Sequence, residues 1–310
     1  MYGAGLQETM PSRRALLGSI GASSAIGAAG CLGSDVLGGD ELEDAREVVS
    51  QYGDVDLAIE AGYELSFPYI YNEDGVTGLI FVNHSQSDIE PELPNALLYN
   101  LDEAGTYDLL GAKWFASTSS VTEPPSLFGE EFSGPRPGET DDIPEHYGLH
   151  AWLFEENPAG MFADTHTGVE PPVYIDDLST VWDELTRFFS NEELAFEHGY
   201  AETDDCISTK DGHYGIPLVN TDLTGTNLET PGVLMYRFGS NWGYNLQGVE
   251  WYVRAEDVND PPTLFGQEFH EPMEGHSPAF EEGTHYGLHA WIFTANPDGV
   301  FALFNPRPLC

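Results

Sequence analysis

The sequence predicts an α+β fold built from two tandem repeats. Three observations predict it. The run His-Tyr-Gly-Leu-His-Ala-Trp-Leu/Ile-Phe occurs twice, at 146–154 and 285–293, helical periodicity precedes strand-like apolar runs in both copies, and 310 residues suit about two domains. Each repeat is expected to have N-terminal helices and a mainly antiparallel sheet of about four strands. We expect the two to pack as a pseudo-dimer within a monomer, related by an internal pseudo-twofold axis.

The first 31 residues are typical of an export signal. Arg13-Arg14 precede a short apolar run, as in twin-arginine signals, and the run ends in a lipobox-like Ala-Ala-Gly-Cys sequence. Cys31 would then carry a lipid; the alternative is an exported protein cut near Gly30, with Cys31 incidental. The run is too short to remain as a membrane-spanning helix. The prediction is an extracytoplasmic protein anchored to the outer face of the cell membrane by its lipid alone, with residues 32–40 as an acidic tether.

The composition combines a packed core with an extreme charge. The chain carries 53 acidic against 10 basic residues, a net charge of -43, yet it is 41% hydrophobic and 12% aromatic, which is typical of a globule rather than of a disordered chain. A surface of dispersed acids with few lysines resembles that of halophilic proteins, which charge keeps hydrated. Nucleic acid is excluded as a partner, because binding it requires a basic patch that displaces counterions.

The two repeats are expected at 41–173 and 174–310, and both begin with a helix. Apolar residues recur at helical spacing over 42–52 and, more clearly, over 178–189. These stripes predict helices that bury one face in the core.

A second, shorter helix follows in each repeat. Asp54 and Asn191 are residue types that cap helix N-termini, and Gly62 and Gly199 stand where a left-handed residue ends a helix. The chain then changes to strand-like runs, which correspond one to one between the repeats. The expected strands and connecting Pro-rich loop are 78–83, 96–99, 107–115, 124–129 and 146–154 in repeat 1, and 215–220, 232–236, 244–252, 261–266 and 285–293 in repeat 2.

The run Tyr-x-Leu-His-x-Trp-Leu/Ile-Phe-x-x-Asn-Pro-x-Gly-x-Phe-Ala, present in both repeats, resembles a family of exported prokaryotic proteins of unknown function. Members of that family look like a single copy, preceded by a helix that ends in Ala-x-x-Gly-Tyr and by a strand that contains a histidine. Repeat 2 matches this pattern with Gly199-Tyr200 and Gly212-His213-Tyr214. Repeat 1 departs from it, since Val76 stands in place of His213 and Lys113 in place of Glu250. The resemblance implies a domain boundary and a candidate site, but no reaction.

Repeat 2 therefore holds the candidate functional site. His213, Glu250 and His289 form a set of two histidines and one carboxylate that suits a single transition-metal ion such as Zn, Fe, Mn or Cu. His285 is a fourth ligand only if Gly287 bends the strand, because four residues of extended chain span about 13 Å. Lys113 of repeat 1 cannot ligate a metal while it is protonated.

Other interpretations of the same residues stay open. The histidines common to both repeats would be structural, bonded to a nearby carbonyl or tyrosine hydroxyl, or Glu250 and His289 would form a metal-free acid–base pair. The sequence holds no nucleophile elbow, His-Glu-x-x-His, Cys-x-x-Cys or phosphate loop, so it does not decide whether the protein is an enzyme. One functional hypothesis is an exported, lipid-anchored protein that uses a metal for binding or simple metal-assisted chemistry. The other is a non-enzymatic interaction or structural module with a protein partner in the cell envelope.

The cysteines also distinguish the repeats. Cys206 and Cys310 lie near the beginning and end of repeat 2, where repeat 1 has Tyr69 and Pro171. Since both are present in one repeat and both are replaced in the other, the pattern predicts a disulfide, which is stable outside the cytoplasm. Two separate buried thiols are the alternative.

Overall fold

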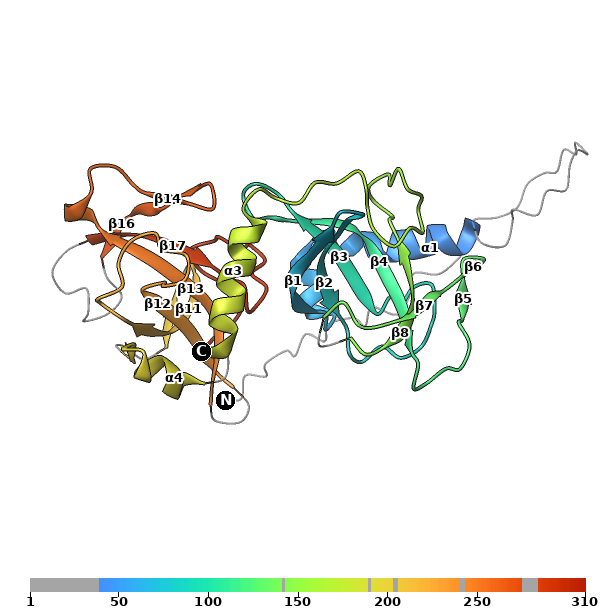
Figure 1. Ribbon diagram of the computed structural model, residues 1–310, viewed down its shortest axis with the longest axis horizontal. Coiled ribbons are helices and arrows are strands. Elements are labelled where there is room, and N and C mark those ends of the chain that lie inside the picture. Colours follow the sequence, from blue (N-terminus) through green and yellow to red (C-terminus); the bar gives the residue numbers. More distant parts are fainter. Residues whose placement is uncertain (1–38, 141–142, 189–190, 203–205, 240–242, 275–283) are drawn as a thin grey trace, which may run out of the picture. The chain divides into compact units, whose positions relative to one another are not determined.

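The structure is a computed structural model, and it combines few helices with mainly antiparallel sheets, as the sequence predicts (Figure 1). The predicted export signal, with Arg13, Arg14 and Cys31, and nearly all of the predicted tether lie outside the residues it describes. No helix within those residues is long and apolar enough to cross a membrane. The described residues are 39–140, 143–188, 191–202, 206–239, 243–274 and 284–310.

Each half of the chain begins with a longer helix, a single 3-10 turn and a shorter helix, and the predicted caps form. The side chains of Asp54 and Asn191 each accept a hydrogen bond from a backbone N–H of the following helix. After each short helix comes a glycine in the left-handed region, Gly62 with φ 91° and Gly199 with φ 88°. The helices are α1 (Gly39–Ser50), α2 (Val55–Glu60), α3 (Ile175–Leu185) and α4 (Glu192–Glu197), and the 3-10 turns are η1 (Gln51–Gly53), η2 (Thr186–Phe188) and, later in the chain, η3 (Ala255–Asp257).

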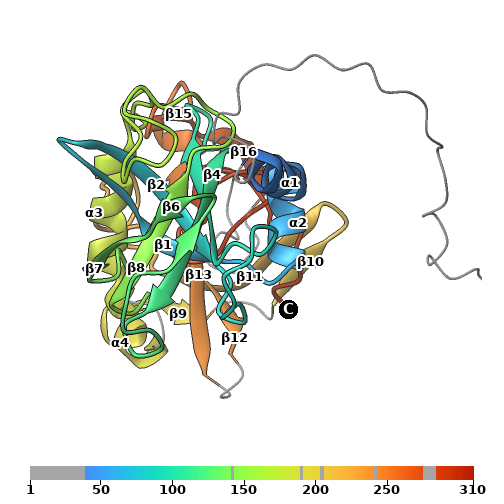
Figure 2. The same ribbon diagram turned by 90° about the vertical axis from the view of Figure 1, so that its right-hand side faces the viewer.

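The first half holds a curled antiparallel sheet of six strands in the order β1-β2-β3-β4-β8-β7 (Figures 1 and 2). A separate two-stranded ribbon pairs β5 with β6. The strands are β1 (Glu64–Asn72), β2 (Gly75–Val82), β3 (Ala96–Leu101), β4 (Tyr107–Ser117), β5 (Ser126–Leu127), β6 (Glu130–Glu131), β7 (Ser133–Arg136) and β8 (His146–Ala151).

The second half holds an antiparallel sheet with the order β10-β11-β12-β13-β17-β16, and the short β9 pairs with β11 beside this path. A ribbon of β14 and β15 corresponds to the ribbon of the first half. The strands are β9 (Ala201–Glu202), β10 (Ile207–Thr209), β11 (Gly212–Val219), β12 (Val233–Phe238), β13 (Tyr244–Arg254), β14 (Thr263–Leu264), β15 (Gln267–Glu268), β16 (His270–Glu274) and β17 (Thr284–Ala290).

Both sheets are larger than the four strands expected from the sequence. The additional strands of the first sheet, β1 and β7, contain Pro68 and Pro135. Proline cannot donate a hydrogen bond to a neighbouring strand, so a proline-containing run is a weak strand signal and is tolerated at an edge. β1 and β7 are indeed the two edge strands of that sheet.

The sheets bury residues on both faces, and this decides where the polar side chains lie. In β2, Leu79 and Phe81 belong to the main apolar core, whereas Ile80 and Val82 belong to a smaller cluster with Trp152. In the second half the smaller cluster includes Tyr214, Met235, Tyr252, Trp291 and Leu309. A polar side chain on the side of the smaller cluster is therefore buried as well.

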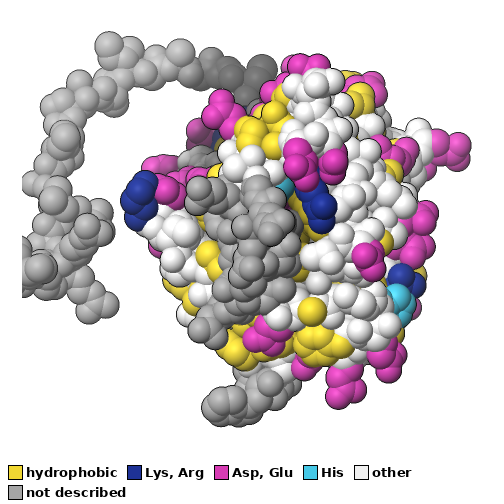
Figure 3. Space-filling view, turned by 90° about the vertical axis from the view of Figure 1, so that its left-hand side faces the viewer, with side chains coloured by type: hydrophobic (Ala, Val, Ile, Leu, Met, Phe, Trp, Pro, Cys, Tyr) yellow, Lys and Arg dark blue, Asp and Glu magenta, His cyan; other side chains and the backbone are white. Residues whose placement is uncertain are grey.

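The surface is dominated by carboxylates. On the face shown in Figure 3, Asp and Glu side chains are scattered among apolar patches, and Lys and Arg are few. This agrees with the excess of acidic residues in the sequence and with a surface that repels polyanions.

Candidate functional site

The candidate site of the second half is centred on Glu250, on the face of the sheet away from the main core. Its neighbours in β13, Val249 and Trp251, both pack into that core, so strand alternation directs Glu250 to the other face. Its cross-strand partner is His289 of β17. The carboxylate lies over Gly287, where a Cβ atom would overlap with Glu250 Oε1. The space that a side chain at 287 would fill is therefore occupied by the carboxylate.

Two imidazoles flank this carboxylate. His285 Nε2 lies 3.4 Å from Glu250 Oε1, and His289 Nε2 lies 3.6 Å from Oε2. The Tyr214 hydroxyl donates a hydrogen bond to Oε2. The side chains of Glu250, His285 and His289 are 2%, 3% and 0% exposed, so water screens the charge of Glu250 little. We call Tyr214, Glu250, His285 and His289 the Glu250 cluster.

Electrostatics favour an ionised carboxylate at the centre of this cluster. Burial is the largest influence and by itself would raise the pKa of Glu250, because a buried charge is costly. The attraction of the neighbouring imidazoles, His289 first and then His285, outweighs burial, so the pKa of Glu250 lies below its ordinary 4.5. Burial, reinforced by the charge of Glu250, raises the pKa of Tyr214 well above its ordinary 10.0. At neutral pH, Tyr214 is thus a neutral donor to a carboxylate anion.

The first half places a cation at the equivalent position. Lys113 of β4 is the cross-strand partner of His150, and a Cβ atom at Gly148 would come within 3.1 Å of Lys113 Cε. Lys113 Nζ donates to Glu139 Oε1 at 2.5 Å, and His146 Nε2 lies 3.8 Å from Glu139 Oε2. The same frame of two histidines around a glycine therefore surrounds a lysine with its counter-ion. We call Lys113, Glu139, His146 and His150 the Lys113 cluster.

Burial also dominates the electrostatics of the Lys113 cluster. It lowers the pKa of Lys113 to about 8, although the attraction of Glu139 opposes the change. It lowers the pKa of His150 to about 4, even though Asp164 Oδ1 lies 3.8 Å from His150 Nδ1. Burial, followed by the charge of Lys113, lowers the pKa of His146. Both imidazoles are neutral at neutral pH, and the Lys113–Glu139 pair carries the charge.

The structure assembles only part of the predicted metal site. Glu250, His285 and His289 come together, whereas His213 forms a backbone bridge with Asn305 and has no ion pair with this group among the described residues. The two imidazoles face different oxygens of the carboxylate that lies between them. No three His, Cys, Asp or Glu side chains in the described part of the chain are placed to hold an ion. Glu250, His285 and His289 are thus the part of the predicted ligand set that comes together among the described residues, and the metal ion itself stays a prediction.

Several residues of the two clusters were not singled out from the sequence. Tyr214 adjoins His213, and an irregularity in the pairing of β10 and β11 falls at this point, so alternation alone does not identify which of the two reaches Glu250. Glu139 lies in an acidic loop, and nothing in its local sequence distinguishes it from the other acids of the chain. The residue that corresponds to Glu139 in the second half lies outside the described residues.

The predicted cysteine pair is brought together. The Sγ atoms of Cys206 and Cys310 lie 2.10 Å apart, the distance of a disulfide bond, and join positions 104 residues apart. The bond links the residue just before β10 to the segment that contains Leu309, which packs in the cluster around Tyr214.

Comparison with protein-family models, curated proteins and solved structures finds no match to the chain. Functional inference therefore rests on the geometry of the two clusters and on the surface of the molecule.

Proposed function

We propose that the chain is an exported, lipid-anchored and non-enzymatic module of the cell envelope, built from two copies of one α+β unit at 41–173 and 174–310. Its partner is a protein of the envelope, and its buried clusters stabilise the sheets rather than perform a reaction. The twin-arginine pair and Cys31 support the proposed location, and the matching strand order of the two sheets supports duplication. The pseudo-twofold arrangement of the copies is part of the proposal.

One observation carries the non-enzymatic assignment: the two clusters have the same frame and opposite central charges. A catalytic carboxylate and a lysine do different chemistry, whereas either can stabilise a fold when counter-charges or hydrogen bonds balance it. Glu139 balances Lys113, and Tyr214, His285 and His289 balance Glu250. Both centres are also buried, and a group that reacts with a substrate must touch it.

The test measures metal content, stability and location on the full chain made in its export-competent host. We expect no stoichiometric metal by mass spectrometry, no effect of chelator on the unfolding midpoint, and a lower midpoint for Glu250→Gln. Stoichiometric metal in the native chain that is lost in both Glu250→Gln and His289→Gln would overturn the structural assignment. Lys113→Met serves as the matched variant, since it changes a buried central charge where no metal is expected. Cys31→Ser should release the protein from the membrane fraction, and unchanged membrane association would contradict the anchor.

A further inference from the structure

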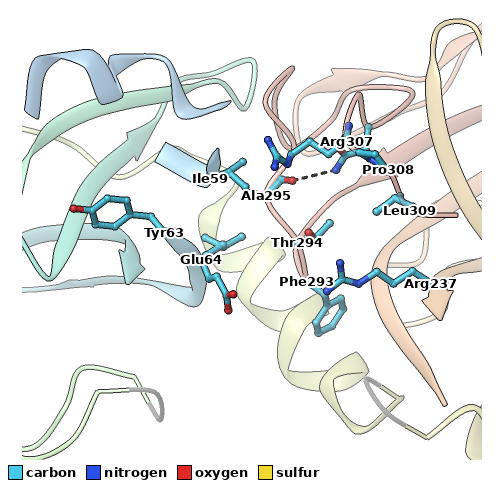
Figure 4. Close-up of a pocket in the computed structure, with 12 residues that line it drawn as sticks. Ile59, Tyr63, Glu64, Arg237, Phe293, Thr294, Ala295, Arg307, Pro308 and Leu309 are labelled. Carbon is cyan, nitrogen blue, oxygen red and sulfur yellow. Dashed lines mark hydrogen bonds between the residues drawn. The ribbon is translucent and has the colours of Figure 1, made fainter. Parts of the chain in front are cut away.

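A cavity of about 480 Å³ lies apart from both clusters (Figure 4). Residues of the first half, Ile59, Glu64 and Leu65, line it together with Arg237, Phe293 and Arg307 of the second half. Its volume is in the range of cavities that hold small molecules, roughly 300 to 1,000 Å³. Apolar side chains and a few charged groups are the usual lining of such a site.

The cationic groups in this cavity stand out because cations are scarce in the chain. Only 10 residues are Lys or Arg against 53 acids, and two of these 10 line this one cavity. Arg307 is engaged, since its Nη1 donates to Asp56 Oδ1 at 2.6 Å. Arg237 is exposed and forms no ion pair with any described residue. Its guanidinium is therefore available to a ligand.

An anionic group from a different strand lines the same cavity. Glu64, the first residue of β1, is exposed and likewise has no ion pair within the described part of the chain. Figure 4 shows the aromatic ring of Phe293 beside the Arg237 side chain. Ile59 and Leu65 add apolar surface from the first half. The cavity thus offers one available positive group, one available negative group and an apolar wall.

We propose that this cavity binds a small zwitterion of the amino-acid type. The ligand's carboxylate bonds to the Arg237 guanidinium, its ammonium group bonds to the Glu64 carboxylate, and its apolar part packs against Phe293, Ile59 and Leu65. A simple anion would be repelled by the Glu64 carboxylate and by the negative field of the whole molecule, and a simple cation would be repelled by Arg237. A molecule with both charges satisfies both groups. This site is independent of the proposed envelope role, and its failure would leave that role untouched.

The experiment is equilibrium dialysis of the mature chain against an equimolar mixture of the standard amino acids, with each amino acid quantified on both sides. We expect one or a few amino acids with apolar side chains to be retained. Arg237→Gln and Glu64→Gln should each weaken retention by about tenfold or more, because each removes one charge-assisted hydrogen bond. Both residues are exposed, so these variants are expected to fold, which circular dichroism checks.

Calorimetric titration of the retained amino acid, its deaminated acid and its decarboxylated amine then assigns the two charges. The acid and the amine should each bind about tenfold more weakly than the parent, and the disadvantage of the acid should vanish in Glu64→Gln. Arg254→Gln is the matched control, since it removes an exposed arginine that does not line the cavity and should leave retention unchanged. The proposal is overturned if no amino acid is retained above the level of Arg237→Gln, if the acid and amine bind as tightly as the parent, or if Arg254→Gln reduces retention equally.

Discussion

The Lys113 cluster and the Glu250 cluster occupy equivalent places in the two halves and differ in the sign of the central charge. In both, two histidines of one strand lie on either side of a glycine, and the central side chain from the neighbouring strand fills the space above that glycine. The frame therefore does not dictate the sign of the charge. The central residue and its partner do, through the Glu139 carboxylate in one half and the Tyr214 hydroxyl in the other.

The largest difference between the halves should appear when Lys113 is replaced by methionine. The change leaves Glu139 with a charge and no nearby cation, in a site where Lys113 is fully buried. Breaking a buried ion pair in this way costs about 3 to 5 kcal/mol. Denaturant unfolding should show this loss, and the double variant Lys113→Met, Glu139→Gln should recover most of it. A double variant no more stable than the single one would show that the pair is not the source of the effect.

The two central glycines should differ in their tolerance of alanine. At 287 a Cβ atom overlaps with a carboxylate that Tyr214 and two histidines hold, whereas at 148 the nearest atoms of Lys113 and His146 are 3.1 Å away. Overpacking of a buried site costs about 1 to 3 kcal/mol, and we expect Gly287→Ala near the upper end and Gly148→Ala near the lower. Thermal unfolding of the two variants compares them directly. Equal losses would mean that the carboxylate moves aside without cost.

The most diagnostic difference should be in pH dependence. The pKa of Lys113 falls from 10.5 to about 8 on folding, so between these values the unfolded chain binds more protons and this residue makes stability rise with pH. The pKa of Glu250 is lowered on folding from 4.5, so its contribution is complete above that value and is lost as pH falls below it. The measurement is the free energy of unfolding as a function of pH for the native chain, for the double variant Lys113→Met, Glu139→Gln and for Glu250→Gln. Subtracting each variant's curve from the native curve gives the pH dependence due to Lys113 and to Glu250, respectively. A basic slope unchanged in the double variant would contradict the assignment to Lys113.

Much of the secondary structure could be predicted because local signals agreed with one another. Asp54, Asn191, Gly62 and Gly199 cap their helices as their residue types indicate. The central strands were predicted from apolar runs buried on both faces. The edge strands β1 and β7 were not, since each contains a proline, which weakens the strand signal of its sequence.

The candidate site was predicted less completely, for a geometric reason. Comparison of the two repeats singled out Glu250 and His289, and the register of the adjacent strands β13 and β17 brings them together. The approach of His285 was expected to require a bend at Gly287, but the structure achieves it differently, because the glutamate side chain lies over the glycine and presents one oxygen to each ring. Side-chain placement of this kind depends on the space left by a missing Cβ atom, which a linear pattern does not reveal.

The Cys206–Cys310 bond also has a mechanical consequence. It closes a covalent loop of 104 residues that contains every strand of the second sheet from β10 to β17. If the protein is pulled between a membrane anchor and a partner bound near Cys310, tension passes through the bond and bypasses those strands. Without the bond, the same segment could unravel by roughly 340 Å at full extension. The bond therefore makes the segment from Cys206 to Cys310 nearly inextensible under load, whereas the rest of the chain has to resist the same force through strand pairing and packing alone.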